Sequence, residues 1–128
     1  MKNNIMENCL VSVVITTKNE EKHIGNCLES IKKQTYPQEF IEVIVVDNNS
    51  DDRTKEIALK YTDKIFGKGP ERSAQRNFGV EKSGGKYVMY LDADMILSKN
   101  VIKDCVRYIE ENREIVALYI SEIVMGKK

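Results

Sequence analysis

Residues 10–16 read Leu-Val-Ser-Val-Val-Ile-Thr, a near-continuous run of mostly β-branched residues. A strand that is covered on both faces has this pattern, because neither of its faces needs polar side chains. Residues 41–46, Ile-Glu-Val-Ile-Val-Val, repeat the pattern, and residues 64–66 and 87–91 are shorter versions of it. Amphipathic stretches separate these runs. The alternation predicts right-handed βαβ units and therefore an α/β fold with a mostly parallel sheet flanked by helices.

The amphipathic stretches between the runs predict helices. Apolar residues recur in them at helical spacing, and residues that commonly cap helices stand at their starts. A fifth strand is expected to begin at Ile115, close to the end of the chain. The expected helices, in chain order, are residues 20–34 with Asn19 as N-cap, a helix that begins at Ser50 or Asp51, residues 72–80 before Gly84 and Gly85, and a helix capped by Ser98.

The composition is that of an ordinary globular chain. Of its 128 residues 41% are hydrophobic, and 20 Lys and Arg balance 20 Asp and Glu. Domains typically have about 100–200 residues, so we expect a single domain over residues 1–128. Balanced charge argues against a nucleic-acid partner, whose phosphates attract an excess of Lys and Arg. The sequence shows no signal-peptide core and no apolar run near the ~20 residues that span a bilayer, which predicts a cytoplasmic chain without a membrane segment.

The cysteine and histidine content argues against a disulfide framework and against a zinc site. The three cysteines, Cys9, Cys27 and Cys105, are odd in number, far apart and in no metal-binding spacing. We therefore expect reduced, buried thiols. The one histidine, His23, is accompanied by no Cys pair that could complete a closed zinc site.

Polar residues follow three of the expected strands. They form the clusters 16–20, 47–52 and 92–94, each directly after an apolar run. In parallel sheets, ligands bind beyond the carboxyl ends of the strands. The three clusters should therefore converge on one crevice that contains the functional residues.

The segment Asp92-Ala93-Asp94 predicts a metal site. Residues two apart in an extended segment point the same way, so both carboxylates can face one cation. Mg²⁺ and Mn²⁺ prefer oxygen ligands and usually take one or two protein carboxylates, with water and substrate phosphate as the other ligands. The alternative is a solvated turn in which Asp92 or Asp94 caps nearby backbone N–H groups.

Asp47, Arg72 and Arg76 are candidates for binding a nucleotide. Asp47 closes the second strand, where a carboxylate can accept a hydrogen bond from a ribose hydroxyl or from the N–H of a pyrimidine base. A turn or N-cap role for Asp47 is the alternative. Arg72 and Arg76 are four residues apart on an expected helix and share a face that can meet a phosphate. Their alternative is two solvated arginines.

The motifs of several other nucleotide-binding and hydrolytic folds are missing from the sequence. No Gly-x-Gly-x-x-Gly follows the first strand, and neither Gly-x-x-x-x-Gly-Lys-Ser/Thr nor Gly-x-Ser-x-Gly occurs. The remaining features are carboxylates for a metal, cationic groups for a polyphosphate and an acidic residue for a base or sugar. This set predicts a nucleotide diphosphate site.

Four segments resemble, in order, motifs of the family 2 glycosyltransferases, which are inverting enzymes of the Rossmann-like GT-A fold. Residues 13–20, Val-Val-Ile-Thr-Thr-Lys-Asn-Glu, resemble the first-strand motif, and residues 45–52, Val-Val-Asp-Asn-Asn-Ser-Asp-Asp, resemble Val-Asp-Asp-Gly-Ser-x-Asp. Residues 74–79, Ala-Gln-Arg-Asn-Phe-Gly, resemble Ala-x-Arg-Asn-x-Gly, and residues 91–94, Leu-Asp-Ala-Asp, match the Asp-x-Asp metal motif. The resemblance covers nearly the whole chain.

The resemblance implies a nucleotide-diphospho sugar, UDP- or GDP-linked, as the donor and Mg²⁺ or Mn²⁺ as the cofactor. An acceptor hydroxyl would attack the anomeric carbon with inversion, a base would deprotonate the acceptor, and the cation would stabilise the departing nucleotide diphosphate. The expected nucleotide-binding residues are Thr16, Lys18, Glu20, Asp47, Arg72, Arg76 and Asp92, and the expected metal ligands are Asp92 and Asp94.

The chain departs from the family pattern at two places. Asn48 and Asn49 stand where the family has Asp-Gly, and the chain stops about where the acceptor half with its catalytic base should begin. We therefore expect a donor-binding half with little activity alone, whose catalytic base is not in the chain. The apolar residues 115–125, which an acceptor half would cover, predict a homo-oligomer that forms through this C-terminal segment.

Two other classes of protein stay open from the sequence. A non-catalytic nucleotide-binding or assembly module would keep the fold without the chemistry. A haloacid-dehalogenase-like phosphotransferase would use Asp92 and Asp94 as nucleophile and acid, although that family has its motif on the first strand.

Overall fold

One six-stranded sheet forms the centre of the molecule, with the strand order β3-β2-β1-β4-β6-β5. The computed structural model describes residues 10–120 and 123–127. The first four strands in this order run parallel, whereas β6 runs antiparallel to β4 and β5 antiparallel to β6. The strands are β1 (Val11–Thr17), β2 (Ile41–Asp47), β3 (Ile65–Gly67), β4 (Tyr87–Asp92), β5 (Ala117–Ile120) and β6 (Ile123–Lys127). The predicted mostly parallel α/β fold is confirmed.

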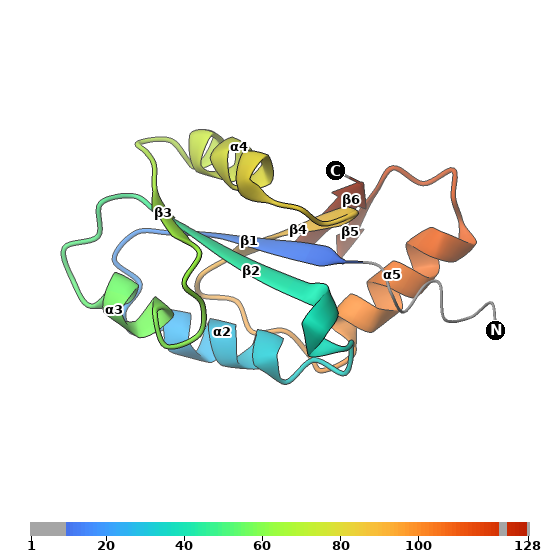
Figure 1. The fold of residues 1–128 in the computed structure, drawn as a ribbon, viewed down its shortest axis with the longest axis horizontal. Coiled ribbons are helices and arrows are strands. Elements are labelled where there is room, and N and C mark those ends of the chain that lie inside the picture. The colour runs from blue at the N-terminus through green and yellow to red at the C-terminus, as the bar shows by residue number, and fades with distance from the viewer. Residues whose placement is uncertain (1–9, 121–122, 128) are drawn as a thin grey trace.

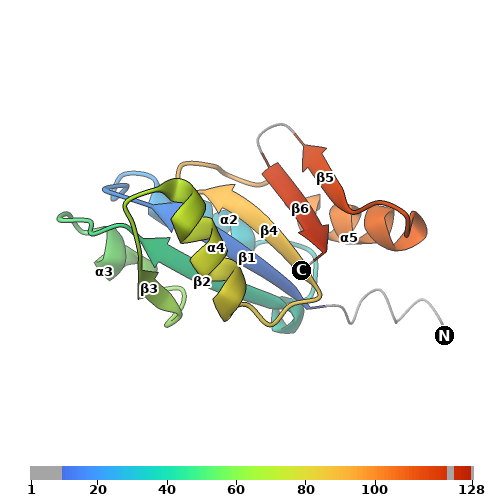
Figure 2. The ribbon, with the colours of Figure 1, turned by 90° about the horizontal axis from the view of Figure 1, so that it is seen from above.

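Helices cover both faces of this sheet (Figure 1). The helix α4 lies over one face, and α2, α3 and α5 lie on the other face. Seen from above in Figure 2, β6 and β5 extend the sheet beyond β4. The helices are α2 (Ile24–Lys32), α3 (Thr54–Ala58), α4 (Arg72–Lys82) and α5 (Val101–Glu111), with a short 3₁₀ helix η1 (Gln38–Phe40) before β2.

The strand β1 is buried along its whole length, which explains its near-continuous apolar sequence. Val13 and Ile15 belong to the larger core under α2 and α5, while Val14 belongs to the smaller core under α4. A Cβ atom on Gly79 would lie 2.4 Å from a methyl carbon of Val14. The glycine of the Ala-x-Arg-Asn-x-Gly segment therefore lets α4 approach the sheet closely, so that its first turns reach the carboxyl end of β1.

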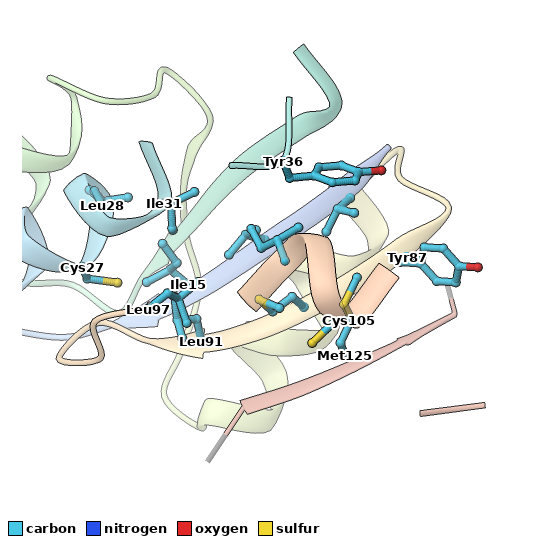
Figure 3. Close-up of a cluster of buried hydrophobic side chains, with 14 of the residues drawn as sticks. Ile15, Cys27, Leu28, Ile31, Tyr36, Tyr87, Leu91, Leu97, Cys105 and Met125 are labelled. Atoms are coloured by element: carbon cyan, nitrogen blue, oxygen red, sulfur yellow. The ribbon is translucent and has the colours of Figure 1, made fainter. Parts of the chain in front are cut away.

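The larger core contains two buried, unpaired cysteines, Cys27 from α2 and Cys105 from α5 (Figure 3). Burial is the main cause that raises the pKa of the Cys105 thiol to about 11. The prediction of reduced, buried thiols is confirmed for these two residues, while Cys9 lies outside the described residues.

The first helix begins later than the sequence predicts. Asn19 does not cap it: its backbone is left-handed, with a φ of 52°, and its side chain reaches the next loop. Asn19 Oδ1 accepts a hydrogen bond from the backbone N–H of Asp51 at 2.9 Å, and its own N–H donates to Ser50 Oγ at 2.7 Å. The loops after β1 and β2 are thus bonded to each other, and α2 starts at Ile24.

Two more predicted helix starts are wrong for a similar reason. The helix α3 begins at Thr54, whose backbone N–H donates to Asp52 Oδ1 at 2.9 Å, and Ser50 is bonded elsewhere in the loop. The helix α5 begins at Val101, and Ser98 contributes a backbone carbonyl to Val101 N–H rather than a side-chain cap. In each case several polar residues precede the helix, and propensity alone does not decide which of them is the cap.

The C-terminal segment folds as a hairpin rather than as one strand. The expected fifth strand is confirmed as β5, but β6 lies between it and β4. The sequence gives no Gly, Pro or Asn between the two apolar runs, so the pattern did not predict a second strand. Within residues 10–120 and 123–127, no helix is long and apolar enough to cross a membrane.

Candidate functional site

A polar cleft of about 590 Å³ opens at the carboxyl ends of β1 and β4. The register of the sheet explains its position: Thr16 of β1 is paired with Val46 on one side and with Asp92 on the other. Six of the residues predicted from the sequence line this cleft: Thr16, Lys18, Glu20, Arg72, Asp92 and Asp94. Thr16, Asn48 and Asp92, one from each of the three strand-end clusters, line the cleft, so the clusters meet at one crevice as predicted.

Two buried threonines at the end of β1 line the cleft with unused hydroxyl groups. Thr16 and Thr17 are each 5% exposed. Within the described part of the chain, neither Oγ1 atom has a hydrogen-bond partner. A buried hydroxyl without a partner costs about 1–3 kcal/mol. A hydrogen bond from a ligand to either hydroxyl would therefore remove this cost.

The side chain of Gln75 ties α4 to the sheet behind these threonines. Its amide Nε2 donates to the carbonyl of Val46 at 2.8 Å and to the carbonyl of Thr17 at 3.2 Å. Because Gln75 bonds to a carbonyl near the end of each of these two strands, β1 and β2, the floor of the cleft is held in place by a buried side chain.

Asp92 at the end of β4 lies opposite the two arginines of α4. Arg72 Nη1 is 3.7 Å from Asp92 Oδ2, and Arg76 Nη2 is 3.8 Å from Asp92 Oδ1. The spacing of four residues places both arginines on one face of α4, as predicted. Arg76 also lies over the ring of Tyr90, with its guanidinium carbon 5.5 Å from the ring centre. The arginine–carboxylate distances are longer than hydrogen bonds, so the guanidinium donors remain available to an anion in the cleft.

Asp94 is exposed and belongs to a turn rather than to an extended segment. Asp92 is the last residue of β4, whereas buried Ala93 and exposed Asp94 are in the turn that follows. The extended geometry predicted for the three residues is therefore wrong, although both carboxylates line the cleft. Burial, together with the charges of Asp94 and Asp92, raises the pKa of the nearby Cys27 thiol to about 12. Negative charge is thus concentrated on this side of the cleft.

The donor set for a metal ion consists of two carboxylates. Among the residues that the structure describes, no cluster of three or more His, Cys, Asp or Glu side chains is arranged to hold a metal. Two hard oxygen donors beside an open polar cleft suit Mg²⁺ or Mn²⁺, which commonly complete their coordination with water and phosphate oxygens. The residues present fit such a cation.

Two predicted residues, Asp47 and Arg76, are not among the residues that line the cleft. Asp47 is 1% exposed, and its two carboxylate oxygens accept hydrogen bonds from the N–H of Ser50 at 2.9 Å and from Ser50 Oγ at 2.6 Å. This geometry is that of the turn role considered as the alternative for Asp47. Arg76 does not line the cleft, but its Nη2 atom lies 3.8 Å from Oδ1 of Asp92, which does.

Sequence reasoning missed five residues that line the cleft. Four of them, Thr17, Asn48, Gln75 and Ala93, stand inside the segments that resemble family motifs, so their place in those segments was a usable signal. The position of Pro70 depends on loop geometry, which no local pattern encodes. The missed residues are Thr17, Asn48, Pro70, Gln75 and Ala93.

Comparisons with known proteins agree with this architecture. A poly(ribitol-phosphate) β-N-acetylglucosaminyltransferase, TarS of Staphylococcus aureus, is 34% identical over 125 residues, which cover 91% of this chain and 22% of that protein. A crystal structure of S. aureus TarS 1–349 in complex with UDP-GlcNAc superposes with a TM-score of 0.71 at 34% identity, covering 81% of this chain and 32% of that one.

A second solved structure shares the fold at low sequence identity. The mannosyltransferase PcManGT from Pyrobaculum calidifontis, in complex with GDP-Man and Mn²⁺, gives a TM-score of 0.83 at 19% identity. That likeness covers 94% of this chain and 45% of PcManGT. The chain therefore spans less than half the length of each of these proteins, and the shared part has the GT-A architecture.

The sequence model of the family "Glycosyl transferase family 2" matches residues 12–127. The matched range contains every strand and helix that the structure describes except the first residue of β1. With this match and the strand-end cleft, the chain belongs to glycosyl transferase family 2.

Proposed function

We propose that this chain binds a nucleotide-diphospho sugar, UDP- or GDP-linked, together with Mg²⁺ or Mn²⁺, and acts as the donor-binding domain of an inverting glycosyltransferase. The observation that carries this proposal is the composition of the cleft. Thr16 and Thr17, whose buried hydroxyls have no partner in the described structure, line the same cleft as Asp92, Asp94 and Arg72. TarS, a relative at about one-third identity, binds UDP-GlcNAc.

In this proposal the diphosphate of the donor lies between the arginines of α4 and the two aspartates. Asp92 and Asp94 would hold the cation, and Arg72 and Arg76 would donate hydrogen bonds to phosphate oxygens. A cation bound there would offset the charge of the departing nucleotide diphosphate. Because Arg72 and Arg76 are already near Asp92, the metal and the arginines would neutralise the same group of negative charges.

The nucleoside would lie over the end of β1. Thr16, Lys18 and Glu20 line that part of the cleft. We also propose a contact between Asp47 and the base, which requires that the bonds of Asp47 to Ser50 open when the ligand enters. If they do not open, Asp47 acts by shaping the loop after β2.

We expect little sugar transfer from this chain alone. Glu110, one of the acids that follow Asp94, is buried and bonded to Lys86 and Arg113 at 2.8 Å each, at the far end of β4 from the cleft. A general base must reach the acceptor hydroxyl within hydrogen-bond distance, directly or through one water. Glu110 is not available for that role.

Titration calorimetry with UDP and GDP, with and without Mn²⁺, tests the proposal. We expect at least one nucleotide to bind more tightly when Mn²⁺ is present, and Asp94→Asn to remove most of that gain. The exposed Asp63, between α3 and β3, provides the matched control, because Asp63→Asn removes the same charge outside the cleft. Failure of both nucleotides to bind the wild-type chain under any of these conditions would refute the donor-site proposal.

The two alternative classes of protein predict different outcomes. An assembly module without a ligand would show the same thermal midpoint with and without nucleotide and Mn²⁺, since only a ligand of the native state raises stability. A haloacid-dehalogenase-like phosphotransferase would show phosphatase activity that Asp92→Asn abolishes. The position of Asp92 at the end of β4 rather than β1 favours the glycosyltransferase proposal over this one.

We also propose that the chain self-associates through its C-terminal segment, residues 115–125, and acts in the cytoplasm. The edge strand β5 supports self-association, because Tyr119 within it and Val116 directly before it are 77% and 71% exposed. Residues 121–122 of the segment lie outside the described residues. Sedimentation velocity across a hundredfold range of concentration would refute self-association if the chain stays a monomer throughout.

A further inference from the structure

Asn48 joins three parts of the molecule at the edge of the cleft. It directly follows β2, and its backbone N–H donates to the carbonyl of Thr17 at 2.9 Å. Its side-chain Nδ2 donates to the carbonyl of Pro70 at 3.0 Å, across 22 residues of sequence. Asn48 thus bonds the end of β2 to the end of β1 and to the segment that leads into α4.

The segment that Asn48 contacts, residues 68–71, connects β3 to α4. Its first residue is fixed by a hydrogen bond from the N–H of Lys68 to the carbonyl of Asp47 at 3.0 Å. Gly69 lies against the Asn48 side chain so closely that a Cβ atom there would be 2.1 Å from Asn48 Oδ1. Pro70, the acceptor of the Asn48 bond, is itself a wall of the cleft. The connector therefore packs closely against the side-chain amide of Asn48.

The connector determines where α4 begins. The helix starts at Arg72, two residues after Pro70. The side chain of Arg72 is 63% exposed, and its Nη1 atom lies 3.7 Å from Asp92 Oδ2, which is too long for a hydrogen bond. Where its guanidinium group lies depends mainly on where the backbone at the start of α4 is held. A displacement of Pro70 would move Arg72 with it.

We propose that Asn48 is a positioning residue, which holds the connector 68–71 through Pro70 and thereby aims Arg72 at the diphosphate of the bound donor. This inference rests on the proposed function, because it concerns the same cleft. Asn48 acts through Arg72 and not on the nucleoside. Its amide N–H₂ group is what makes the bond to Pro70, so an amide in this position has a structural reason.

The test compares affinities for a nucleoside diphosphate and for the matching nucleoside. The diphosphate probe is UDP or GDP, whichever binds the wild-type chain more tightly, and the nucleoside probe is the matching uridine or guanosine. Both affinities are measured by NMR titration in the presence of Mn²⁺. Asn48→Ala should weaken diphosphate binding about three- to tenfold, the size of one lost hydrogen bond, and leave nucleoside binding within about twofold. The same substitution in an Arg72→Gln background should have little further effect, because the residue on which Asn48 acts is gone.

Gly69→Ala gives a second, independent variant, which removes no polar group from the cleft. Its new methyl group displaces the Asn48 side chain, so it should weaken diphosphate binding as Asn48→Ala does. In the Asn48→Ala background the methyl group has room, and Gly69→Ala should add little. Asn112→Ala is the matched control, since Asn112 Nδ2 donates to the carbonyl of Tyr108 at 2.8 Å at the end of α5, and its loss should leave both affinities unchanged.

The outcomes separate this inference from the proposed function. If the wild-type chain binds neither UDP nor GDP, the proposed function fails and the inference fails with it. If the wild-type chain binds but Asn48→Ala and Gly69→Ala bind equally well, the positioning role is overturned and the proposed function stands. Equal losses for nucleoside and diphosphate, or an undiminished effect of Asn48→Ala in the Arg72→Gln background, would also overturn the positioning role.

Discussion

The two ends of the parallel strands differ in whether their polar side chains have hydrogen-bond partners. At the amino end, Ser12 Oγ donates to Glu42 at 2.6 Å and accepts from the N–H of Gly85 at 2.9 Å. Glu42 in turn accepts from the N–H of Gly84 at 2.9 Å and pairs with Lys64 at 2.6 Å. These hydrogen bonds and the ion pair to Lys64 lower the pKa of Glu42 against the opposing effect of its burial.

A second network at the amino end surrounds Glu110 of α5. Its carboxylate pairs with Lys86 and Arg113 at 2.8 Å each and accepts a hydrogen bond from the hydroxyl of Tyr87 at the start of β4. Although burial opposes it, these partners together lower the pKa of Glu110 to about 2.

At the carboxyl end, by contrast, several polar groups of the cleft have no close hydrogen-bond partner in the described structure. The hydroxyls of Thr16 and Thr17 have no partner within the described residues, and the Asp92–arginine distances of 3.7 and 3.8 Å are too long for hydrogen bonds. Paired groups at one end stabilise the fold, whereas unpaired groups at the other end are available to a ligand. Substitutions at the two ends should therefore have effects of opposite kind.

The largest effect on stability is expected from Glu110→Ala. The substitution leaves Tyr87 and two cations without their shared acceptor and should lower the free energy of unfolding by about 3 kcal/mol. Urea unfolding at pH 7 measures the change. The exposed neighbour Glu111 is the control, and Glu111→Ala should change the free energy of unfolding by less than about 0.5 kcal/mol. Equal effects of the two substitutions would show that the network contributes no stability.

Acid should remove the same contribution without any substitution. The pKa of Glu110 is about 2 in the folded chain against 4.5 for the unperturbed group, so the folded state favours the charged form. The stability it contributes is fully present above pH 4.5 and is lost as the pH falls toward 2. Between pH 5 and pH 2 the wild-type chain should therefore lose more stability than Glu110→Gln, as measured by urea unfolding at each pH. Parallel curves for the two proteins would contradict this assignment.

The next largest effect is expected from a methyl group at Gly85. A Cβ atom there would lie 2.6 Å from Ser12 Oγ, 2.8 Å from Ser12 N and 2.8 Å from the carbonyl oxygen of Tyr87. Because two of these atoms belong to the backbone of the sheet, Gly85→Ala should cost about 2 kcal/mol. Gly84 is the matched control, since its Cβ would have no neighbour within 4 Å. Thermal unfolding of the two variants measures the difference, and equal midpoints would argue against close packing around Gly85.

The difference between the two ends also explains what the sequence could and could not predict. The parallel strands follow from the β-branched runs, and five of the cleft residues follow from the rule that ligands bind at the carboxyl ends of such strands. These predictions depend on local pattern and on one general property of parallel sheets. They needed no knowledge of which side chains meet.

Two of the errors concern contacts between segments far apart in the sequence. Asn19 was expected to cap a helix but instead bonds the loop 32 residues away, at Asp51. The strand β6 was missed because its place between β4 and β5 depends on a hairpin without a turn signal. Asp47, for which a turn role was the alternative, bonds the nearby Ser50 and does not line the cleft. Polar residues at a strand end have several possible partners, and tertiary packing decides among them.

The smallest expected change, and one of opposite sign, comes from the carboxyl end itself. Thr17→Val keeps the shape of the side chain and removes a buried hydroxyl that has no partner in the described structure. Without ligand, the free energy of unfolding should rise by about 1 kcal/mol, because the desolvation cost of that hydroxyl disappears.

Thr62 provides the matched control for this prediction. Its hydroxyl donates to the carbonyl of Val43 at 2.9 Å and accepts from the N–H of Lys64 at 3.1 Å, so Thr62→Val should destabilise the chain. Nucleotide affinity should be weaker for Thr17→Val than for the wild type and unchanged for Thr62→Val. Thermal unfolding with and without UDP and Mn²⁺ measures both quantities on one sample. If Thr17→Val is less stable than the wild type, the Thr17 hydroxyl of the wild type is satisfied in solution. The proposed contrast between the two ends of the sheet would then fail at the residue where it predicts a gain in stability.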